Sequence, residues 1–253
     1  MFRHKQIKPA NMQERLKNSL LPLYETLLKK INFPQDIYSF CMQWGSKFPK
    51  EENTGILFVG KATNGWMTNS RDIEILFGAS ESRIFARGDQ MKWVNNLENN
   101  KEGYNTRTSS FWRLIKQISQ LEYGENEWYS KIAWSNLYKV SCEVGNPTQR
   151  LKNQQQDLCK KILEEEIRIL KPKCIIFLTS GWEKNFIKHL IDDLPINNKV
   201  NAKWGNGYNT NGYLINDVIY ITTPHPQGKN EKKHLQAIKE TINHFEKIKI
   251  ANV

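Results

Sequence analysis

His225 is the residue that the sequence most clearly presents for chemistry. It lies between Pro224 and Pro226 and follows the apolar, β-branched run 218–223. Because proline fixes its own φ and restricts the residue before it, His225 has little backbone freedom at the end of this predicted strand. A neutral histidine held in this way can act as a fixed hydrogen-bond donor to charge that develops on a leaving group. The alternative is a surface histidine beside two prolines that only end the strand.

Three further apolar runs also predict strands that end in polar loops. They cover residues 55–60, 131–138 and 173–179, and helical patterns separate them. This alternation favours an α/β fold with an open, mainly parallel sheet, in which ligands bind outside the carboxyl ends of the strands. The loops at those four ends are 61–66, 136–139, 179–182 and 223–227. They bring His, Asn, Lys, Thr and Trp to one edge of the sheet, which predicts a site there.

Asn136 is the unusual member of the second run. It is an amide inside an otherwise apolar and aromatic segment. A buried amide needs hydrogen-bond partners, so a ligand edge is one group that could satisfy it.

Helical spacing of apolar residues predicts the elements that must position these strands. Helices over 11–31 and 33–45 would form an N-terminal helical extension, residues 1–50, packed on an α/β domain of residues 51–253. In the helix expected from Ser109, the apolar stripe runs through Phe111 and Leu114, with Trp112 off that stripe. Other helices are expected at 150–170, after 182 and at 231–248. The Gly- and Asn-rich segment 197–211 leads into a short strand at 212–215.

Charge and cysteine content narrow the function classes. The 253-residue chain has 37 Lys and Arg against 26 Asp and Glu, which gives a net charge of +11. A positive surface attracts polyanions such as nucleic acid, although the base composition of a genome can also make its proteins rich in lysine. The four cysteines contain no C-x-x-C pair, which excludes a zinc ribbon or a thioredoxin motif. No apolar run is long enough to span a membrane, and the basic N-terminus lacks an apolar signal core. We therefore expect a cytoplasmic protein with reduced thiols and no membrane partner.

The order of these motifs resembles the uracil-DNA glycosylase superfamily. The resemblance is carried by a first strand that ends on Gly60, Asn136 within the second strand, and His225-Pro226 after the last strand. Residues 163–173 and the strand after them are similar to the bacterial and archaeal iron–sulfur branch. Residues 111–114 resemble a segment of the mismatch-specific branch.

The resemblance implies a three-layer α/β/α sandwich around a four-stranded, mainly parallel sheet. It also implies catalysis by His225, as the donor to the developing uracil O2 anion, while Asn136 reads the edge of an extruded base beside Gly60. Trp66, Phe77 and Phe85 are the candidates for the aromatic ring that stacks on the base. We expect His225, Asn136 and Asn64 to line one cleft beneath that ring. Predicted contacts to the nucleic-acid backbone come from Lys61, Lys139, Ser180, Gln227 and Lys229.

The first and last motifs depart from the family pattern. Lys61 stands where the iron–sulfur branch has Glu, Ala62 stands where others have Asp or Asn, and the motif proline is missing. Asn64 is therefore the catalytic candidate for positioning water, with a purely turn-supporting role as the alternative. Gln227-Gly228 replaces the usual Ser-Pro or Ser-Gly, and Lys229, Asn230 and Glu231 stand where the apolar wedge is expected.

The resulting hypothesis is a glycosylase-like protein of base excision repair. It binds DNA or a nucleobase and excises a modified base by hydrolysis of the N-glycosidic bond, as a hydrolase without metal or other cofactor. Cys142 and Cys159 have a spacing similar to two ligands of the iron–sulfur branch, but Cys41 and Cys174 do not complete the pattern, so no cluster is expected. The alternatives are a non-catalytic binder of the same fold and a basic protein-interaction protein.

Overall fold

Four parallel strands with apolar, buried side chains form the centre of the fold. The computed structural model describes residues 11–49, 54–63, 71–78, 88–95 and 105–251. Strands β3 (Ile56–Gly60), β4 (Ile132–Asn136), β6 (Cys174–Leu178) and β9 (Val218–Thr223) lie in the order β4-β3-β6-β9, and each neighbouring pair is parallel. The strand runs predicted from the sequence are confirmed. Their carboxyl ends meet at one edge, as parallel pairing requires.

The sheet is larger than the four-stranded sheet that we expected. It has seven strands and is mixed, in the order β2-β4-β3-β6-β9-β8-β7. The additional strands are antiparallel to their neighbours: β2 (Gln43–Trp44) pairs with β4, β8 (Tyr208–Ile215) with β9, and β7 (Lys199–Trp204) with β8. A separate two-stranded sheet joins β1 (Tyr38–Ser39) to β5 (Val140–Ser141).

The Gly- and Asn-rich segment forms most of a β-hairpin. The sequence predicts a strand only at 212–215, whereas β8 begins at Tyr208 and β7 precedes it. Burial alternates along β8: Thr210, Gly212 and Leu214 are buried on the face toward α6, while the residues between them on the other face are only partly buried. The hairpin turn uses Gly205 and Gly207, which adopt positive φ values of 56° and 84°. Because many of its side chains are polar, hydropathy alone does not predict this edge hairpin.

The helix predicted over 33–45 is wrong. This segment contains the short strands β1 and β2 instead. Ile37, Phe40, Cys41 and Trp44 have helix-like spacing, but they are buried against different elements rather than along one stripe. The Phe40 N–H donates to the Lys139 carbonyl oxygen at 2.7 Å, and Trp44 pairs with Ala133 of β4. The N-terminal segment therefore completes the sheet rather than forming a purely helical extension.

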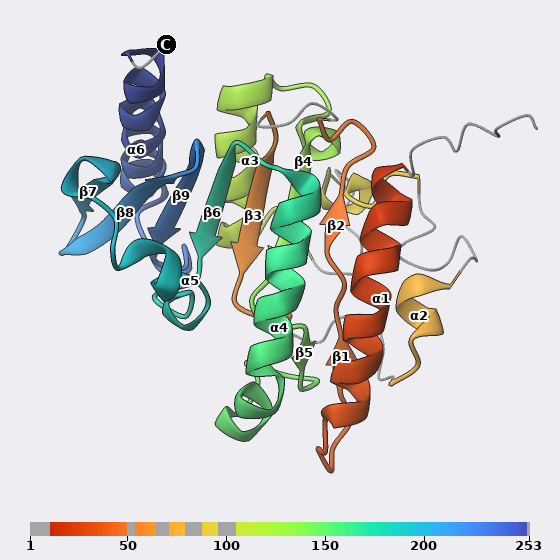
Figure 1. Ribbon diagram of the computed structural model, residues 1–253. Helices are drawn as coiled ribbons and strands as arrows, with labels where there is room; N and C mark the ends of the chain where they lie inside the picture. Colours follow the sequence, from red (N-terminus) through yellow and green to blue (C-terminus); the bar gives the residue numbers. More distant parts are fainter. Residues whose placement is uncertain (1–10, 50–53, 64–70, 79–87, 96–104, 252–253) are drawn as a thin grey trace, which may run out of the picture.

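Helices cover both faces of the sheet (Figure 1). One layer contains α1 (Met12–Lys30), α4 (Gln149–Leu170) and α5 (Lys184–Ile191), and the other contains α3 (Ser110–Tyr123) and α6 (Glu231–Ala251). The short helix α2 (Glu74–Phe77) packs beside α1 through Phe77 and Tyr24. Short 3-10 helices are η2 (Lys92–Asn95), η3 (Trp128–Lys131) and η4 (Ile196–Asn198). None of the helices in the described ranges is long and apolar enough to cross a membrane.

A fully buried ion pair joins α4 to the segment that follows β4. The Lys139 ammonium donates to both carboxylate oxygens of Glu166, at 2.8 and 2.9 Å, and neither side chain is exposed. Ser135 of β4 contacts both partners, since its hydroxyl donates to Glu166 and accepts from Lys139, each at 2.6 Å. Burial raises the pKa of Glu166, whereas Lys139 and Ser135 favour its charged form. Each charge thus compensates part of the desolvation cost of burying the other.

Replacing Glu166 by Ala should strongly destabilise the fold. The substitution leaves the Lys139 charge buried without its partner, a loss of about 3–5 kcal/mol in the free energy of unfolding. Urea denaturation of the full chain measures this difference. Glu165→Ala is the matched control on the same helix, because Glu165 pairs with Arg168 on the surface and should cost less than about 1 kcal/mol. Equal losses for the two variants would contradict the role given to the buried pair.

Candidate functional site

The carboxyl edge of the sheet brings together Asn136, Gly60 and His225. Gly60 and Asn136 are register partners at the ends of β3 and β4. His225 follows β9 by two residues, at the same edge. Asn136 and Gly60 end strands whose alternate side chains Trp134 and Phe58 belong to the core on the α3 side. The site therefore faces α3 rather than α4.

Asn136 is buried and only partly satisfied. Its side chain is 2% exposed, and its Nδ2 atom has no hydrogen-bond partner among the described residues. A Cβ atom at Gly60 would collide with Asn136 Oδ1 and would lie 3.5 Å from Phe111 Cζ. Glycine is thus required for this amide to lie against the end of β3. An unpartnered buried amide is costly, so the geometry favours a ligand that accepts from Nδ2.

Phe111 is the aromatic residue at this site. Its ring stacks on the His225 ring with a centroid separation of 5.8 Å and an interplanar angle of 14°. The sequence-based choice of aromatic residues missed it, because the apolar stripe assigned Phe111 to the core and left Trp112 outside. The structure reverses these roles: Trp112 is buried in the core, while Phe111 is only partly buried. The sequence did mark where this helix begins, because Ser109 precedes residues 111–114 and caps α3.

Backbone contacts fix the orientation of His225. Its N–H donates to the Ser180 hydroxyl at 2.8 Å, and the Gln227 N–H donates to His225 Nδ1 at 3.3 Å. Because Nδ1 accepts a hydrogen bond, the neutral imidazole carries its proton on Nε2. Ser180 itself lies in a left-handed turn, with φ 54°, followed by Gly181 with φ 90°. His225 therefore presents an Nε2–H donor on a loop that is held from both sides.

The surroundings keep His225 uncharged. Burial, together with the ammonium groups of Lys61 and Lys229, lowers the pKa of His225 from 6.5 to about 4. At neutral pH the ring is therefore an uncharged donor. The nearby lysines supply the positive potential instead.

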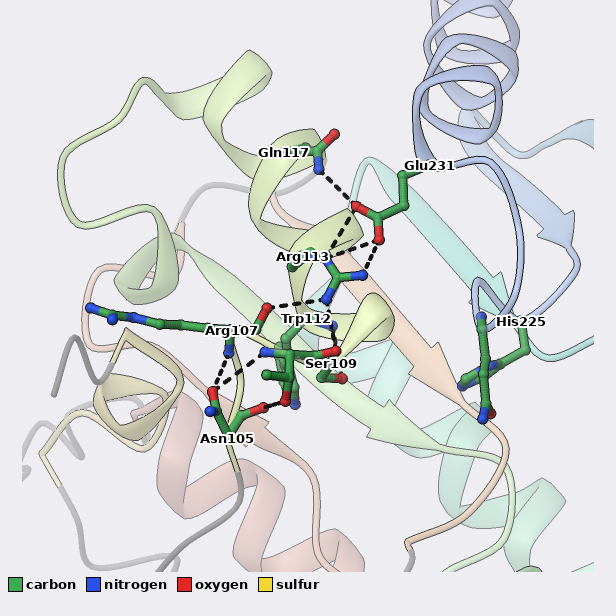
Figure 2. Close-up of polar contacts among 10 residues, drawn as sticks. Asn105, Arg107, Ser109, Trp112, Arg113, Gln117, His225 and Glu231 are labelled. Atoms are coloured by element: carbon green, nitrogen blue, oxygen red, sulfur yellow. Dashed lines mark hydrogen bonds and ion pairs between the residues drawn. The ribbon is translucent and has the colours of Figure 1, made fainter. Parts of the chain in front are cut away.

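An ion pair fixes the loop after His225 to the helix that carries Phe111. Arg113 of α3 forms a bidentate contact with Glu231 at the start of α6, and Gln117 also donates to Glu231 (Figure 2). The opposite side of the Arg113 guanidinium donates to the carbonyl oxygens of Arg107 and Thr108, at 3.1 and 2.7 Å. Figure 2 shows Arg113 between Glu231 and the 105–109 loop, with His225 on the neighbouring loop. The ion pair thus restrains both aromatic rings of the site.

A buried polar chain supports the end of β9. The Trp204 indole N–H donates to the Thr210 hydroxyl at 2.9 Å, Thr210 and Thr223 share a hydrogen bond at 2.8 Å, and Thr223 contacts His234 Nε2 at 2.8 Å. The Trp204 and His234 rings also stack at 4.3 Å. Burial, followed by Lys229 and His225, lowers the pKa of His234 to about 4. Thr223 lies two residues before His225, so these hydrogen bonds fix the end of the strand that precedes His225.

Comparison with protein families identifies the fold family. The Uracil DNA glycosylase superfamily model matches residues 45–248, which include every residue placed at the site. The chain belongs to the uracil-DNA glycosylase superfamily. No curated protein in the comparison matches the chain. The family match begins after β2, so α1, β1 and β2 precede it.

Two of the predicted site residues lie elsewhere in this superfamily member. Lys139 cannot contact a nucleic-acid phosphate, because it is fully buried and paired with Glu166. Phe77 cannot stack on a base at the carboxyl edge, because it packs against Tyr24 in the core beneath α1. Alternating hydropathy could not reveal either case, since both depend on contacts with distant elements.

The remaining predicted residues have different outcomes. The structure brings Gly60, Asn136 and His225 together and places Lys61, Ser180, Gln227 and Lys229 in the loops around them. Asn64, Trp66 and Phe85 lie outside the described residues. The roles proposed for all ten of these residues remain predictions.

The thiols do not form a metal site in the described part of the chain. Cys41 and Cys159 are buried in the core on the α1 and α4 side, Cys174 lies in the core on the other side of the sheet, and Cys142 is partly exposed. A four-cysteine cluster needs four thiolates that converge on one point, whereas these cysteines lie on both sides of the sheet. The four cysteines therefore do not fit an iron–sulfur cluster.

A charged groove lies at the opposite edge of the sheet. It has a volume of about 500 Å³ and is lined by residues that precede β3, β6 and β9, together with residues of α3 and α6: Thr54, Glu122, Lys173, Asp217, Glu246 and Lys249. Lys173 and Glu122 neutralise each other there. The groove lacks the unpartnered amide and the aromatic ring found at the carboxyl edge.

Substitution of Lys61 or Lys229 by Ala should raise the pKa of His225 from about 4 toward 6.5, because each removes a cation that disfavours the imidazolium. Titration of the imidazole resonances by NMR measures this change. Lys199→Ala, at the far edge strand β7, is the control and should leave the value unchanged.

The same titration predicts a pH effect on stability. Between about pH 4 and 6.5 the unfolded chain binds a proton at this histidine that the folded chain does not, so the free energy of unfolding should fall as the pH is lowered through this window. His225→Ala should reduce that dependence. A His225 pKa that stays near 6.5 in the wild type would contradict the described environment.

Proposed function

We propose that this protein binds an unpaired DNA base at the carboxyl edge of the sheet and releases an altered base by hydrolysis of its N-glycosidic bond. The observation that carries the proposal is the buried Asn136 amide, which lies beside Phe111 and the neutral His225 and whose Nδ2 has no hydrogen-bond partner among the described residues. Family membership supports this class of substrate. The proposed setting is base excision repair in the cytoplasm.

Each side chain has a distinct proposed role in binding. Phe111 offers a ring face on which a base can stack, and stacking accepts any base without reading its identity. Asn136 Nδ2 donates to an acceptor on the edge of the base, while its Oδ1 remains beside Gly60. Because the amide cannot be satisfied by water when it is buried, a base without an acceptor at that position is disfavoured.

Hydrolysis follows from the position of the His225 donor. Water adds its oxygen to C1′ as the bond from C1′ to the base nitrogen breaks, and the electron pair of that bond leaves with the base. The negative charge spreads onto a carbonyl oxygen of the base, where His225 Nε2–H can donate to it. The water proton passes to solvent, and the base anion takes a proton from solvent. A neutral donor keeps its hydrogen bond without transferring its own proton.

The positive charges near His225 favour the same transition state. Lys61 and Lys229 lower the pKa of His225, so both lie close enough to influence charge at this site. Their attraction for a departing base anion adds to the hydrogen bond from Nε2–H. These lysines also attract the phosphates that flank the base.

Binding without turnover is a second candidate function. Lys61 follows Gly60 at the position where a water-orienting carboxylate would lie near C1′. Glu183 is the acidic residue whose charge reaches Lys61, but its carboxylate accepts from Thr179 at the end of β6. No hydrogen bond within the described ranges brings a carboxylate to Asn136, Phe111 or His225. A protein of this kind would hold the base without cleaving its bond.

Release of free base should depend on both His225 and Asn136. Single- and double-stranded oligonucleotides containing uracil, hypoxanthine or another altered base are incubated with the full chain, and free base is quantified by chromatography. His225→Ala should lower the rate about 100- to 1000-fold, the effect of removing one oxyanion donor. Asn136→Ala should weaken binding of the altered base as well as slow its release.

Two surface substitutions control for general effects on the fold. His189→Ala on α5 and Asn243→Ala on α6 remove exposed side chains of the same types away from the site. Base release that is unchanged by His225→Ala and Asn136→Ala would refute the proposed chemistry. Binding of altered bases without release would select the non-catalytic alternative.

Gly60→Ala should close the base site while leaving most of the fold intact. The added methyl group collides with Asn136 Oδ1 and crowds Phe111, so the affinity for a base-containing ligand should fall at least about 10-fold through displacement of the amide. Gly88→Ala is the matched control, because no atom lies within 4 Å of its added Cβ. Calorimetric titration with a short oligonucleotide measures the affinity. Unchanged affinity in Gly60→Ala would exclude this position as the base site.

A further inference from the structure

Two aromatic rings, each with lysine side chains over it, flank His225: Lys61 and Lys152 lie over Trp182, and Lys229 lies over Tyr208. On one side, Lys152 Nζ lies 3.6 Å and Lys61 Nζ 5.3 Å from the centroid of the Trp182 ring. On the other side, Lys229 Nζ lies 4.8 Å from the centroid of the Tyr208 ring. Both aromatic side chains are partly exposed. Each therefore combines a ring face with a positive charge.

The positions of these rings follow from the sheet. Trp182 stands two residues after Ser180, the residue that accepts the His225 N–H. Tyr208 begins β8, which pairs with β9 in the register Asn211 to Thr222. Extending that register by three residues places Tyr208 opposite His225. The two rings thus lie on the β6 side and on the β8 side of the His225 loop.

The lysines over these rings stay outside the ion pairs of the described residues. Lys61, Lys152 and Lys229 form no ion pair with a carboxylate in the ranges that the structure describes. Burial, and then Lys229 and Lys152, lower the pKa of Lys61, so the Lys61 ammonium is repelled by the other two. An anion bound among them would relieve that repulsion. The phosphates of a DNA strand are anions of this kind.

The loop that carries His225 lacks a side chain suited to opening a duplex. Proteins that unstack duplex DNA insert a large apolar side chain between base steps. Residues 224–230 contain Pro, His, Gln, Gly, Lys and Asn, with no large apolar member. Lys229 extends over Tyr208 instead of projecting an apolar wedge. A strand whose bases are already unpaired needs no such wedge.

We propose that the protein takes its base from single-stranded DNA. The nucleotides on either side of the target base stack on Trp182 and Tyr208, and Lys61, Lys152 and Lys229 bind their phosphates. This inference rests on the proposed function for the identity of the central site. It adds the strand preference and the two stacking positions. Aromatic rings with interleaved cations are the usual means of holding a single strand without reading its sequence.

Fluorescence anisotropy with one labelled oligonucleotide, single-stranded or annealed to its complement, tests the strand preference. The oligonucleotide contains no altered base, so binding is measured apart from excision. The wild-type chain should bind the single strand more tightly than the duplex. Trp182→Ala and Tyr208→Ala should each weaken single-strand binding about 5- to 100-fold, the range found for loss of one stacking partner. Trp182→Phe should retain most of the affinity.

Two controls separate stacking from loss of structure and from general charge effects. Tyr129→Ala removes a partly buried tyrosine at the amino end of β4 and should leave binding unchanged. Lys152→Ala should reduce the slope of log affinity against log salt concentration by about 0.7, the value for one phosphate contact on a single strand. Lys249→Ala, at the opposite edge, should leave the slope unchanged.

Two outcomes would overturn this inference. One is equal or tighter binding of the duplex by the wild type, and the other is unchanged single-strand affinity in both Trp182→Ala and Tyr208→Ala. If single-strand binding depends on both rings but no base is released, the strand preference stands and only the proposed excision is contradicted. The assay therefore distinguishes failure of the strand preference from failure of the proposed reaction.

Discussion

The buried contact between Lys139 and Glu166 is the interaction on which the site depends most. It joins α4 to the chain that leaves β4, and Ser135 within β4 completes it. Asn136 is the next residue, and its side chain points to the opposite face of the sheet. The ion pair on the α4 side thus anchors the strand end that presents the amide on the α3 side. Lys139, which the sequence predicted to contact DNA, instead supports the strand end that carries Asn136.

The site combines a neutral hydrogen-bond donor with nearby positive charge. Burial and two lysines keep His225 uncharged, and the Gln227 N–H fixes its tautomer. The same lysines extend over the partly exposed rings of Trp182 and Tyr208. Binding and leaving-group stabilisation would therefore draw on one set of charges. The ion pair between Arg113 and Glu231 fixes the position of the helix that carries Phe111 relative to the loop that carries His225.

The N-terminal region contributes to the rigidity of this arrangement. β2 pairs with β4, and the Tyr24 hydroxyl of α1 donates to the Phe40 carbonyl oxygen at 2.8 Å. The Phe40 N–H in turn donates to the carbonyl oxygen of Lys139, in the segment that follows β4. The strand that ends in Asn136 is thus supported on its outer side by residues that precede the family match. Stability of this region and precision of the site are linked.

The sequence by itself predicted the four parallel strands and the long helices, and it placed Gly60, Asn136 and His225 at the carboxyl ends of those strands. Those conclusions follow from local hydropathy, proline restriction and the rule for strand ends. Only the tertiary structure decided that Lys139 is buried, that Phe77 packs in the core and that Phe111 is the ring beside His225. The tertiary structure also showed that short strands lie within residues 38–44 and that a hairpin begins at residue 199. These features depend on partners far along the chain, and a buried ion pair or an edge hairpin has no local pattern that distinguishes it from a solvated lysine or a polar loop.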